Sequence, residues 1–252
     1  MALYMIGLGL FDEKDITLRG LEAVKRCEIV FLEDYTSKLS VNVENLEKLY
    51  GKKILLASRE IVEKHAGDIL DKAKEKDVAF LVVGDVFSAT THVDFYLRAK
   101  EKDIPVHIIY NTSIVSAVGL VGLELYKFGK TTSMPYFEKG FRPRTPYEVI
   151  GQNQKAGMHT LILLDIKKDL EKYMTVNEGL HQFLDIEADL KQDIVTKDTF
   201  VIGCARLGSD APEIRYGKVS ELLAHDFGKP LHCIIVPGKL HFMEEEMLKL
   251  WS

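Results

Sequence analysis

The stretch VAFLVVGDVFSATTH, residues 78–92, decides how the rest of the chain is interpreted. Its first six residues, Val78–Val83, form an uncharged apolar run that is typical of a strand buried on both faces of a parallel sheet. The run ends at Gly84-Asp85, and a short polar segment then leads into a helical pattern. Because ligands of open α/β sheets bind where strands end, this turn is a candidate site. An ordinary turn with a Ser/Thr helix cap explains the same residues equally well.

The sequence around this stretch alternates between short apolar strands and amphipathic helices. Further strands are expected at residues 3–8, 29–32, 54–57 and 106–110, and helices are expected after Thr17, which can cap its helix, and at 44–50, 61–76 and 92–102. This rhythm predicts a parallel sheet with right-handed crossovers. One more helix is expected over residues 114–122, where two glycines indicate close packing against a neighbour.

The second half of the chain has a different pattern of strands and helices. Strands are expected at residues 131–136, 160–164, 199–205, 214–218 and 231–236, and the polar 214–218 segment suits an antiparallel edge. Two helix starts are predicted, one with Thr145 as its cap and Pro146 in the first turn, and one with the Thr175–Glu178 capping box. The change in this pattern near residues 110–130 predicts two α/β domains, residues 1–111 and 112–252.

Composition narrows the class of protein. The chain has 252 residues, of which 46% are hydrophobic and 28% charged, as in globular proteins. A net charge of −5 argues against a broad basic face for nucleic acid. The three cysteines are scattered and fit buried thiols in a reducing compartment. No apolar run is long enough for a membrane span, and the start of the chain lacks the basic region of a signal peptide. A cytoplasmic protein is expected.

Several common sites are excluded by their missing motifs. The glycines at Gly7 and Gly9 suggest a dinucleotide fingerprint, but Asp12 occupies its third position and a polar loop separates Gly9 from the next helix. The eight histidines show no HExxH spacing and the cysteines no paired spacing, so no metal site is predicted. A Walker sequence and a G-x-S-x-G nucleophile elbow are also absent.

Small or polar groups at the ends of strands are the remaining candidates. Such groups follow or begin six expected strands and could converge on one cleft between two domains: Gly7-Leu8-Gly9-Leu10, Gly84-Asp85, Thr112-Ser113-Ile114, Leu164-Asp165, Arg206-Leu207-Gly208 and His232. Asp85 could accept hydrogen bonds from an amine or hydroxyls. Backbone groups near the leucines could hold a purine-sized ring, and an uncharged, carbonyl-lined pocket also suits a sulfonium cation.

Taken together, several segments resemble one known family. They are IGLGLFDEKDIT (6–17), GDVFSATTH (84–92), NTSIVSAVG (111–119), YKFGKTTSMPYF (126–137), LLDIK (163–167), CARLGSDAPEIRYG (204–217) and HDFGKPLHCIIVPGKLHFME (225–244). In combination they are similar to the diphthine synthase family, a branch of the tetrapyrrole (corrin/porphyrin) methylase superfamily. The resemblance extends from Met1 to about Glu244.

The resemblance implies two α/β domains of the tetrapyrrole methylase type, with a parallel N-terminal sheet, a mixed C-terminal sheet and S-adenosyl-L-methionine in the cleft between them. It implies a homodimer that methylates the amino group of a modified histidine on translation elongation factor 2 during diphthamide biosynthesis. How many methyl groups are added, and whether the carboxylate is also esterified, stays open. Carried over position by position, the implied cofactor contacts are Leu10, Asp85, Ser88, Ser113, Ile114, Leu164, Leu207 and His232.

Some features leave alternatives open. Family members usually have proline where this chain has Val86, a change worth about 0.4–1 kcal/mol in loop rigidity. No general base is assigned: Asp165 is one candidate, and a capping or loop aspartate is the alternative reading. The loop 137–144 could grip a protein substrate or simply be solvated. Two rival functions are a methylase acting on a tetrapyrrole and a non-enzymatic ligand sensor or scaffold.

Overall fold

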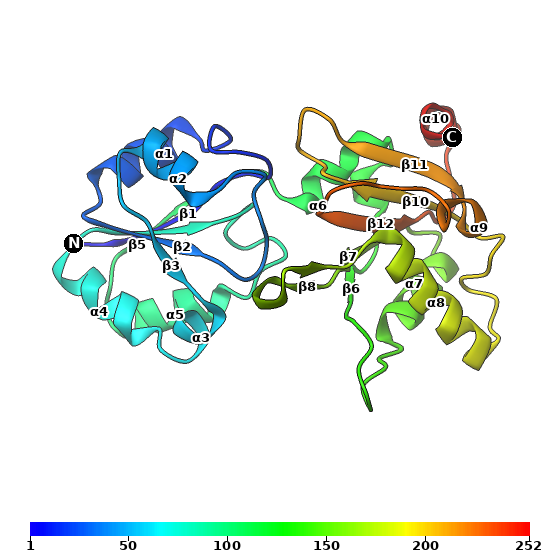
Figure 1. Cartoon of the computed structure of the whole chain (residues 1–252), viewed down its shortest axis with the longest axis horizontal. Helices are drawn as coiled ribbons and strands as arrows, with labels where there is room; N and C mark the ends of the chain where they lie inside the picture. The colour runs from blue at the N-terminus through cyan, green and yellow to red at the C-terminus, as the bar shows by residue number, and fades with distance from the viewer. The chain divides into compact units, whose positions relative to one another are not determined.

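The structure, a computed structural model, describes all 252 residues and divides into two compact units, Met1–Ala117 and Val118–Ser252 (Figure 1). Each unit is built around one five-stranded sheet. The division into folding domains 1–111 and 112–252 stays a prediction. No helix in the chain combines the length and apolar character needed to cross a membrane.

The first unit contains the predicted parallel sheet. Its strands are β1 (Leu3–Gly7), β2 (Ile29–Glu33), β3 (Leu55–Ala57), β4 (Val78–Val82) and β5 (Val106–Ile109). They lie in the order β3-β2-β4-β1-β5, and every neighbouring pair is parallel. All five residues of β4 are buried, which confirms the interpretation of the 78–83 run as a central strand.

Helices cover both faces of this sheet. They are α1 (Leu18–Arg26), α2 (Val43–Tyr50), α3 (Arg59–Glu63), α4 (Gly67–Glu75) and α5 (Val93–Glu101). A short helix, α6 (Ile114–Ala117), follows β5 at the end of this unit. In Figure 1, α1 and α2 lie on one face and α3, α4 and α5 on the other, each with its own apolar core. The predicted cap at Thr17 is confirmed, since its side chain accepts a hydrogen bond from the Gly20 N–H at 3.0 Å.

Two expected helices differ from the prediction. The single helix over 61–76 is instead α3 and α4, because the His65 N–H closes a turn on the carbonyls of Glu60 and Ile61. The expected helix over 114–122 is α helical only as far as Ala117 and ends in a 3-10 turn, Val118–Val121. Gly122 stops it with φ +90, and a Cβ there would lie 2.4 Å from Met247 Cβ. Close packing therefore explains this glycine.

The second unit contains a mixed sheet, as the resemblance implied. Its strands are β6 (Thr132–Met134), β7 (Thr160–Leu164), β10 (Phe200–Ala205), β11 (Glu213–Lys218) and β12 (His232–Val236), in the order β11-β10-β12-β7-β6. Only β6 and β7 are parallel, and β11 is the predicted antiparallel edge. A small hairpin of β8 (Ile166–Lys167) and β9 (Lys172–Tyr173) was not predicted, because strands of two residues carry no periodic signal.

The helices of this unit are α7 (Thr145–Lys155), α8 (Val176–Leu190), α9 (Val219–Leu222) and α10 (Phe242–Leu248), with further 3-10 turns at Leu125–Lys127, Lys168–Leu170 and Lys249–Trp251. Residues of α7, α8 and α9 pack with the sheet in one apolar core. The Thr175 capping box is confirmed. The predicted cap at Thr145 is wrong, because Arg144 holds the capping position and makes no side-chain cap bond.

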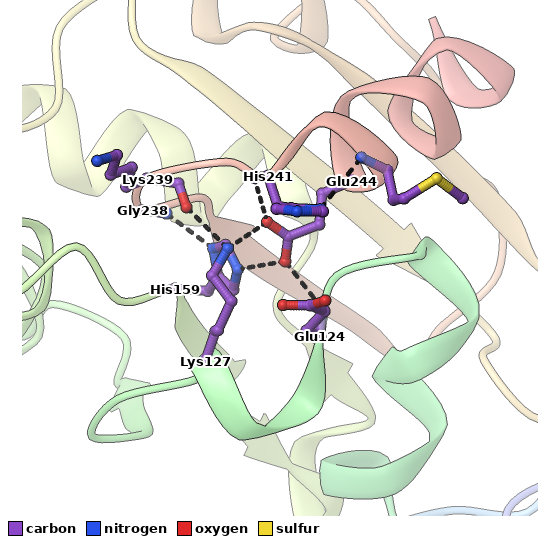
Figure 2. Close-up of polar contacts among 8 residues, drawn as sticks. Glu124, Lys127, His159, Gly238, Lys239, His241 and Glu244 are labelled. Carbon is purple, nitrogen blue, oxygen red and sulfur yellow. Dashed lines mark hydrogen bonds and ion pairs between the residues drawn. The ribbon is translucent and has the colours of Figure 1, made fainter.

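A buried carboxylate ties α10 to the rest of the second unit (Figure 2). Glu244 is only 1% exposed and accepts hydrogen bonds from the Lys127 ammonium, the His159 ring and the backbone N–H groups of Glu124 and His241. These partners hold the pKa of Glu244 down to about 2 against the opposing effect of burial. A buried charge is tolerated here because every part of it is paired.

Candidate functional site

Two glycine turns meet at the carboxyl edge of the first sheet. Gly9, after β1, and Gly84, after β4, exchange backbone hydrogen bonds of 3.2 and 2.7 Å in an isolated antiparallel bridge. Both have positive φ, +80 and +81, which glycine adopts without strain. The bridge places the segments that carry Leu10 and Asp85 side by side, although they are far apart in the sequence.

The Asp85 carboxylate mainly accepts hydrogen bonds from within the protein, which hold the turn after β4 in place. It is 6% exposed; its Oδ1 accepts hydrogen bonds from the Phe87 N–H and the Ser88 hydroxyl, each at 3.1 Å, and its Oδ2 accepts one from the Asn111 N–H at 3.1 Å. A carboxylate offers about four acceptor positions, so about one is left for a ligand. The turn after β4 is thereby attached to the end of β5, across the end of β1.

The rest of the 84–92 loop is held by contacts among its own residues. Val86 is fully buried, and its carbonyl accepts the Thr90 hydroxyl at 2.7 Å and lies 3.3 Å from His92 Nδ1. Burial lowers the pKa of His92, so the ring is neutral and Nδ1 carries the donated proton. Ala89 has φ +60, a conformation uncommon for a residue with a side chain, directly after Ser88.

Ser113 begins the short helix after β5. Its hydroxyl accepts the Val115 N–H at 3.1 Å and its carbonyl accepts the Ala117 N–H at 2.9 Å. Ser113 is buried and Ile114 half-buried. The structure therefore brings together, at the ends of β1, β4 and β5, the predicted contact residues of the first unit, namely Leu10, Asp85, Ser88, Ser113 and Ile114.

The other predicted contacts lie together at one end of the second sheet. Ala205 pairs with His232 across β10 and β12, and Cys233 pairs with Leu163 across β12 and β7. This register puts Leu164, the last residue of β7, opposite His232, the first of β12. Leu207 follows β10 by two residues, after Arg206 with φ +54. Their backbones therefore share one edge, because β12 runs opposite to β7 and β10.

His232 has both ring nitrogens engaged within the protein. Nδ1 accepts the Val176 N–H at 3.3 Å, at the start of α8, and Nε2 lies 3.2 and 3.0 Å from the carbonyls of Gly228 and Lys229. Burial lowers the pKa of His232, which keeps the ring neutral. Arg206 donates to the carbonyl of Lys229 as well, at 2.7 Å. A ligand near His232 would therefore meet backbone groups rather than a free imidazole.

Asp165, the candidate base, braces the turn after β7. Its Oδ1 accepts the Ile166 N–H and its Oδ2 accepts the Tyr136 N–H, both at 2.9 Å. The Asp165 carbonyl also accepts the Met174 N–H at 3.0 Å, which closes the base of the β8–β9 hairpin. These contacts favour the reading of Asp165 as a loop aspartate.

In neither unit do the predicted contact residues carry a positive charge. In the first unit, Asp85 supplies a carboxylate and Leu10 an apolar side chain. In the second unit, burial lowers the pKa of His232 so that its ring is neutral, and Leu164 and Leu207 are apolar. No group of three or more His, Cys, Asp or Glu side chains is arranged to hold a metal ion.

Two further residues, Asp15 and Asn111, shape this edge although nothing in the sequence marked them as part of a site. Asp15 Oδ2 accepts the N–H groups of Leu10 and Phe11, at 3.1 and 2.8 Å. Asn111 joins the ends of β1, β4 and β5. Their only local signals were an aspartate in a polar loop and an asparagine after a strand, both common in turns.

Comparison with known proteins gives a consistent result. Residues 2–223 match the family model described as Tetrapyrrole (Corrin/Porphyrin) Methylases. The diphthine synthase of Methanocaldococcus jannaschii is 49% identical, over 98% of this chain and 97% of its own. The diphthine methyl ester synthase of Schizosaccharomyces pombe is 46% identical, over 99% and 94%. A crystal structure of diphthine synthase superposes with a TM-score of 0.91 at 37% identity, covering 100% of this chain and 96% of the other.

Proposed function

The chain belongs to the tetrapyrrole (corrin/porphyrin) methylase family, in its diphthine synthase branch, and is a methyltransferase; from this premise we propose that it uses S-adenosyl-L-methionine to methylate a modified histidine on translation elongation factor 2. The group methylated is the amino group of that side chain, as in diphthamide biosynthesis. Relatives of both kinds, diphthine synthases and a diphthine methyl ester synthase, match almost the whole chain.

The observation that carries the proposal is that each unit gathers its own predicted contacts at one end of its sheet. In the first unit the Gly9–Gly84 bridge and the Asp85–Asn111 bond draw three strand ends together. In the second unit the strand register gathers Leu164, Leu207 and His232. We propose that these two sets face one another and hold the cofactor between them.

The protein's task in such a transfer is positioning. The bound sulfonium supplies an activated methyl group with its own leaving group, so little bond chemistry is left for side chains. Backbone groups near Leu10 and Leu207 orient the cofactor, and the remaining acceptor position of Asp85 takes one polar hydrogen. Holding nitrogen, carbon and sulfur in line supplies several kcal/mol of the barrier reduction.

The attacking amine must lose its proton before it reacts. Asp85, the one carboxylate among the predicted contacts, already accepts three hydrogen bonds. Each oxygen of Asp165 accepts one backbone N–H. We therefore assign no general base. Transfer of the proton to water before the amine enters a desolvated site is consistent with these contacts.

The test is an acceptor assay. Elongation factor 2 from cells that lack this step is incubated with the protein and S-adenosyl-L-methionine, and the mass of the modified peptide is read in steps of one methyl group. We expect at least one step, lost when the acceptor histidine is replaced. The final number of steps, before and after mild alkali that hydrolyses esters, separates amine methylation from carboxylate methylation. No mass gain, together with methylation of a tetrapyrrole acceptor, would overturn the proposal.

Two further properties belong to the proposal. We propose that the chain acts as a homodimer in the cytoplasm, because the resemblance implies a dimer and the three cysteines are free and buried, as suits a reducing compartment. Light scattering on the purified protein measures the first property, and a mass of one chain contradicts it. Microscopy of the tagged protein in its own cell measures the second.

A further inference from the structure

Asn111, at the end of β5, is the meeting point of the predicted cofactor segments of the first unit. Its backbone N–H donates to Asp85 Oδ2 at 3.1 Å. Its side-chain Nδ2 donates to the carbonyls of Gly7 and Asp15, each at 3.0 Å. Its Oδ1 accepts the Thr112 N–H at 2.7 Å, next to Ser113. One residue thus contacts the ends of β1 and β4 and starts the turn into α6.

Through its contact with Asp15, Asn111 also affects the position of Leu10. Asp15 Oδ2 accepts the N–H groups of Leu10 and Phe11, at 3.1 and 2.8 Å, so it fixes the backbone of the loop after Gly9. Asn111 in turn holds the Asp15 backbone. Leu10 itself makes no direct bond to Asn111, so the effect runs through the Asp15 side chain.

The glycines of the GLG sequence leave room for these two side chains. A Cβ on Gly7 would lie 2.8 Å from Asn111 Cβ and 2.7 Å from the Gly84 carbonyl oxygen. A Cβ on Gly9 would lie 2.5 Å from Asp15 Cβ. All three distances are shorter than the contacts that real Cβ atoms make. The Gly-x-Gly pattern that resembled a dinucleotide fingerprint therefore accommodates Asn111 and Asp15 instead.

We propose that Asn111 is the positioning residue of the cofactor site. It sets the relative places of Leu10, Asp85 and Ser113 without touching the cofactor, and Asp15 passes its effect to Leu10. This inference rests on the proposed use of S-adenosyl-L-methionine. Loss of the Nδ2 donations should misplace three contacts at once and weaken cofactor binding, while catalysis at saturating cofactor stays close to normal.

The experiment compares Asn111→Asp with a matched control, Asn153→Asp. Asn111→Asp keeps the oxygen that accepts the Thr112 N–H and loses both Nδ2 donations. Asn153 in the second unit makes a similar set of side-chain bonds, to Lys130 N–H, the Lys130 carbonyl and the Thr160 hydroxyl, at 3.1, 2.9 and 2.9 Å. None of these partners is a predicted cofactor contact, so Asn153→Asp reports general destabilisation alone.

Calorimetric titration with S-adenosyl-L-methionine and steady-state kinetics are the readouts. We expect Asn111→Asp to raise the Kd and KM for the cofactor about tenfold or more, as loss of about 1.4 kcal/mol would, with a kcat within a few-fold of the parent. Asn153→Asp should lower the unfolding midpoint without raising KM. Equal Kd values for the parent and Asn111→Asp would overturn the inference. Failure of the parent to bind the cofactor would overturn the proposed function itself.

A second pair of variants keeps the test open if Asn111→Asp does not fold. Asp15→Ala removes the acceptor for the Leu10 and Phe11 N–H groups, whereas Asp15→Asn keeps an oxygen that can accept them. We expect Asp15→Ala to raise KM and Asp15→Asn to restore most of the affinity. Equal KM values for these two variants would contradict the route through Asp15.

Discussion

The ring of His159 and the carboxylate of Glu244 are hydrogen-bonded at 3.0 Å, although 85 positions separate them in the sequence. Both side chains are almost completely buried. The other ring nitrogen of His159 accepts the Gly238 N–H at 2.9 Å, so the ring is neutral and donates from Nε2 to Glu244. This pair, with Lys127, anchors α10 on the second unit (Figure 2).

Replacement of Glu244 by glutamine should destabilise the protein. The substitution keeps the shape but removes the charge that four donors share, which should cost about 1.5–3 kcal/mol of unfolding free energy. Urea denaturation at neutral pH measures the loss. Glu246→Gln in the same helix is the control, because Glu246 is exposed and pairs only with Lys249. Equal midpoints for the two variants would contradict a role for the buried carboxylate.

The low pKa of the Glu244 carboxylate predicts that the free energy of unfolding decreases at acid pH. The pKa of Glu244 is about 2 in the folded protein against an ordinary value of 4.5. Its stabilisation is therefore present above about pH 4.5 and is lost as the pH falls toward 2, amounting to about 3 kcal/mol at most. Urea midpoints measured between pH 6 and pH 3 should fall less steeply in Glu244→Gln than in the parent.

His92 and His232 should be neutral and in opposite tautomers at pH 7. The proton of His92 is on Nδ1, facing the Val86 carbonyl, and that of His232 is on Nε2, facing the carbonyls of Gly228 and Lys229. Nitrogen-15 chemical shifts of the two rings distinguish the tautomers directly. The exposed His65 is the control and should show the average of both. A charged His232 at pH 7 would contradict the assigned contacts.

Acid should weaken the hydrogen bonds that His232 makes. Its pKa is lowered from 6.5 by burial, so the stabilisation from the neutral ring is present above about pH 6.5 and lost as the pH falls below that value. Protonation removes the acceptor for the Val176 N–H. Cofactor affinity of the parent should therefore decline in acid, at a pH below 6.5, and His232→Asn should flatten this decline.

The substitution Asp165→Asn distinguishes two roles for Asp165, a structural hydrogen-bond acceptor and a general base. As a brace, the residue loses one of two backbone acceptors, and we expect about 1 kcal/mol less stability with kcat reduced less than tenfold. As a general base, its loss would reduce kcat by about a hundredfold or more. Single-turnover kinetics with saturating elongation factor decide between the two, and a loss of the larger size would make Asp165 catalytic.

The three cysteines should resist thiol reagents in the folded protein. All are buried and free, and Cys204 directly faces Cys233 across β10 and β12. Burial raises the pKa of Cys27 to about 11, which leaves almost no reactive thiolate at neutral pH. Mass spectrometry after a short exposure to iodoacetamide should show no added group in buffer and three in urea. Rapid labelling in buffer would contradict the buried positions.

The alternation of strands and helices in the first half could be predicted because its signals are local. Thr17 and Thr175 cap helices through bonds to residues three positions away, and the apolar run at 78–83 needs only its own composition to indicate a buried strand. The prediction of one helix over residues 61–76 was wrong because it also depended on local signals alone. Its apolar positions keep one period through the break at His65, so the pattern hides the turn.

The sequence by itself determined most of the strands and helices along the chain, the parallel character of the first sheet and the strand ends that carry candidate groups. Only the tertiary structure decided that the Asp85 carboxylate is bonded to Asn111 and that Nδ1 of His232 accepts the Val176 N–H. The physical reason is distance along the chain. Caps and periodicity depend on residues within a turn or two, whereas a hydrogen bond between Asn111 and Gly7 exists only after the sheet has ordered β1 beside β5.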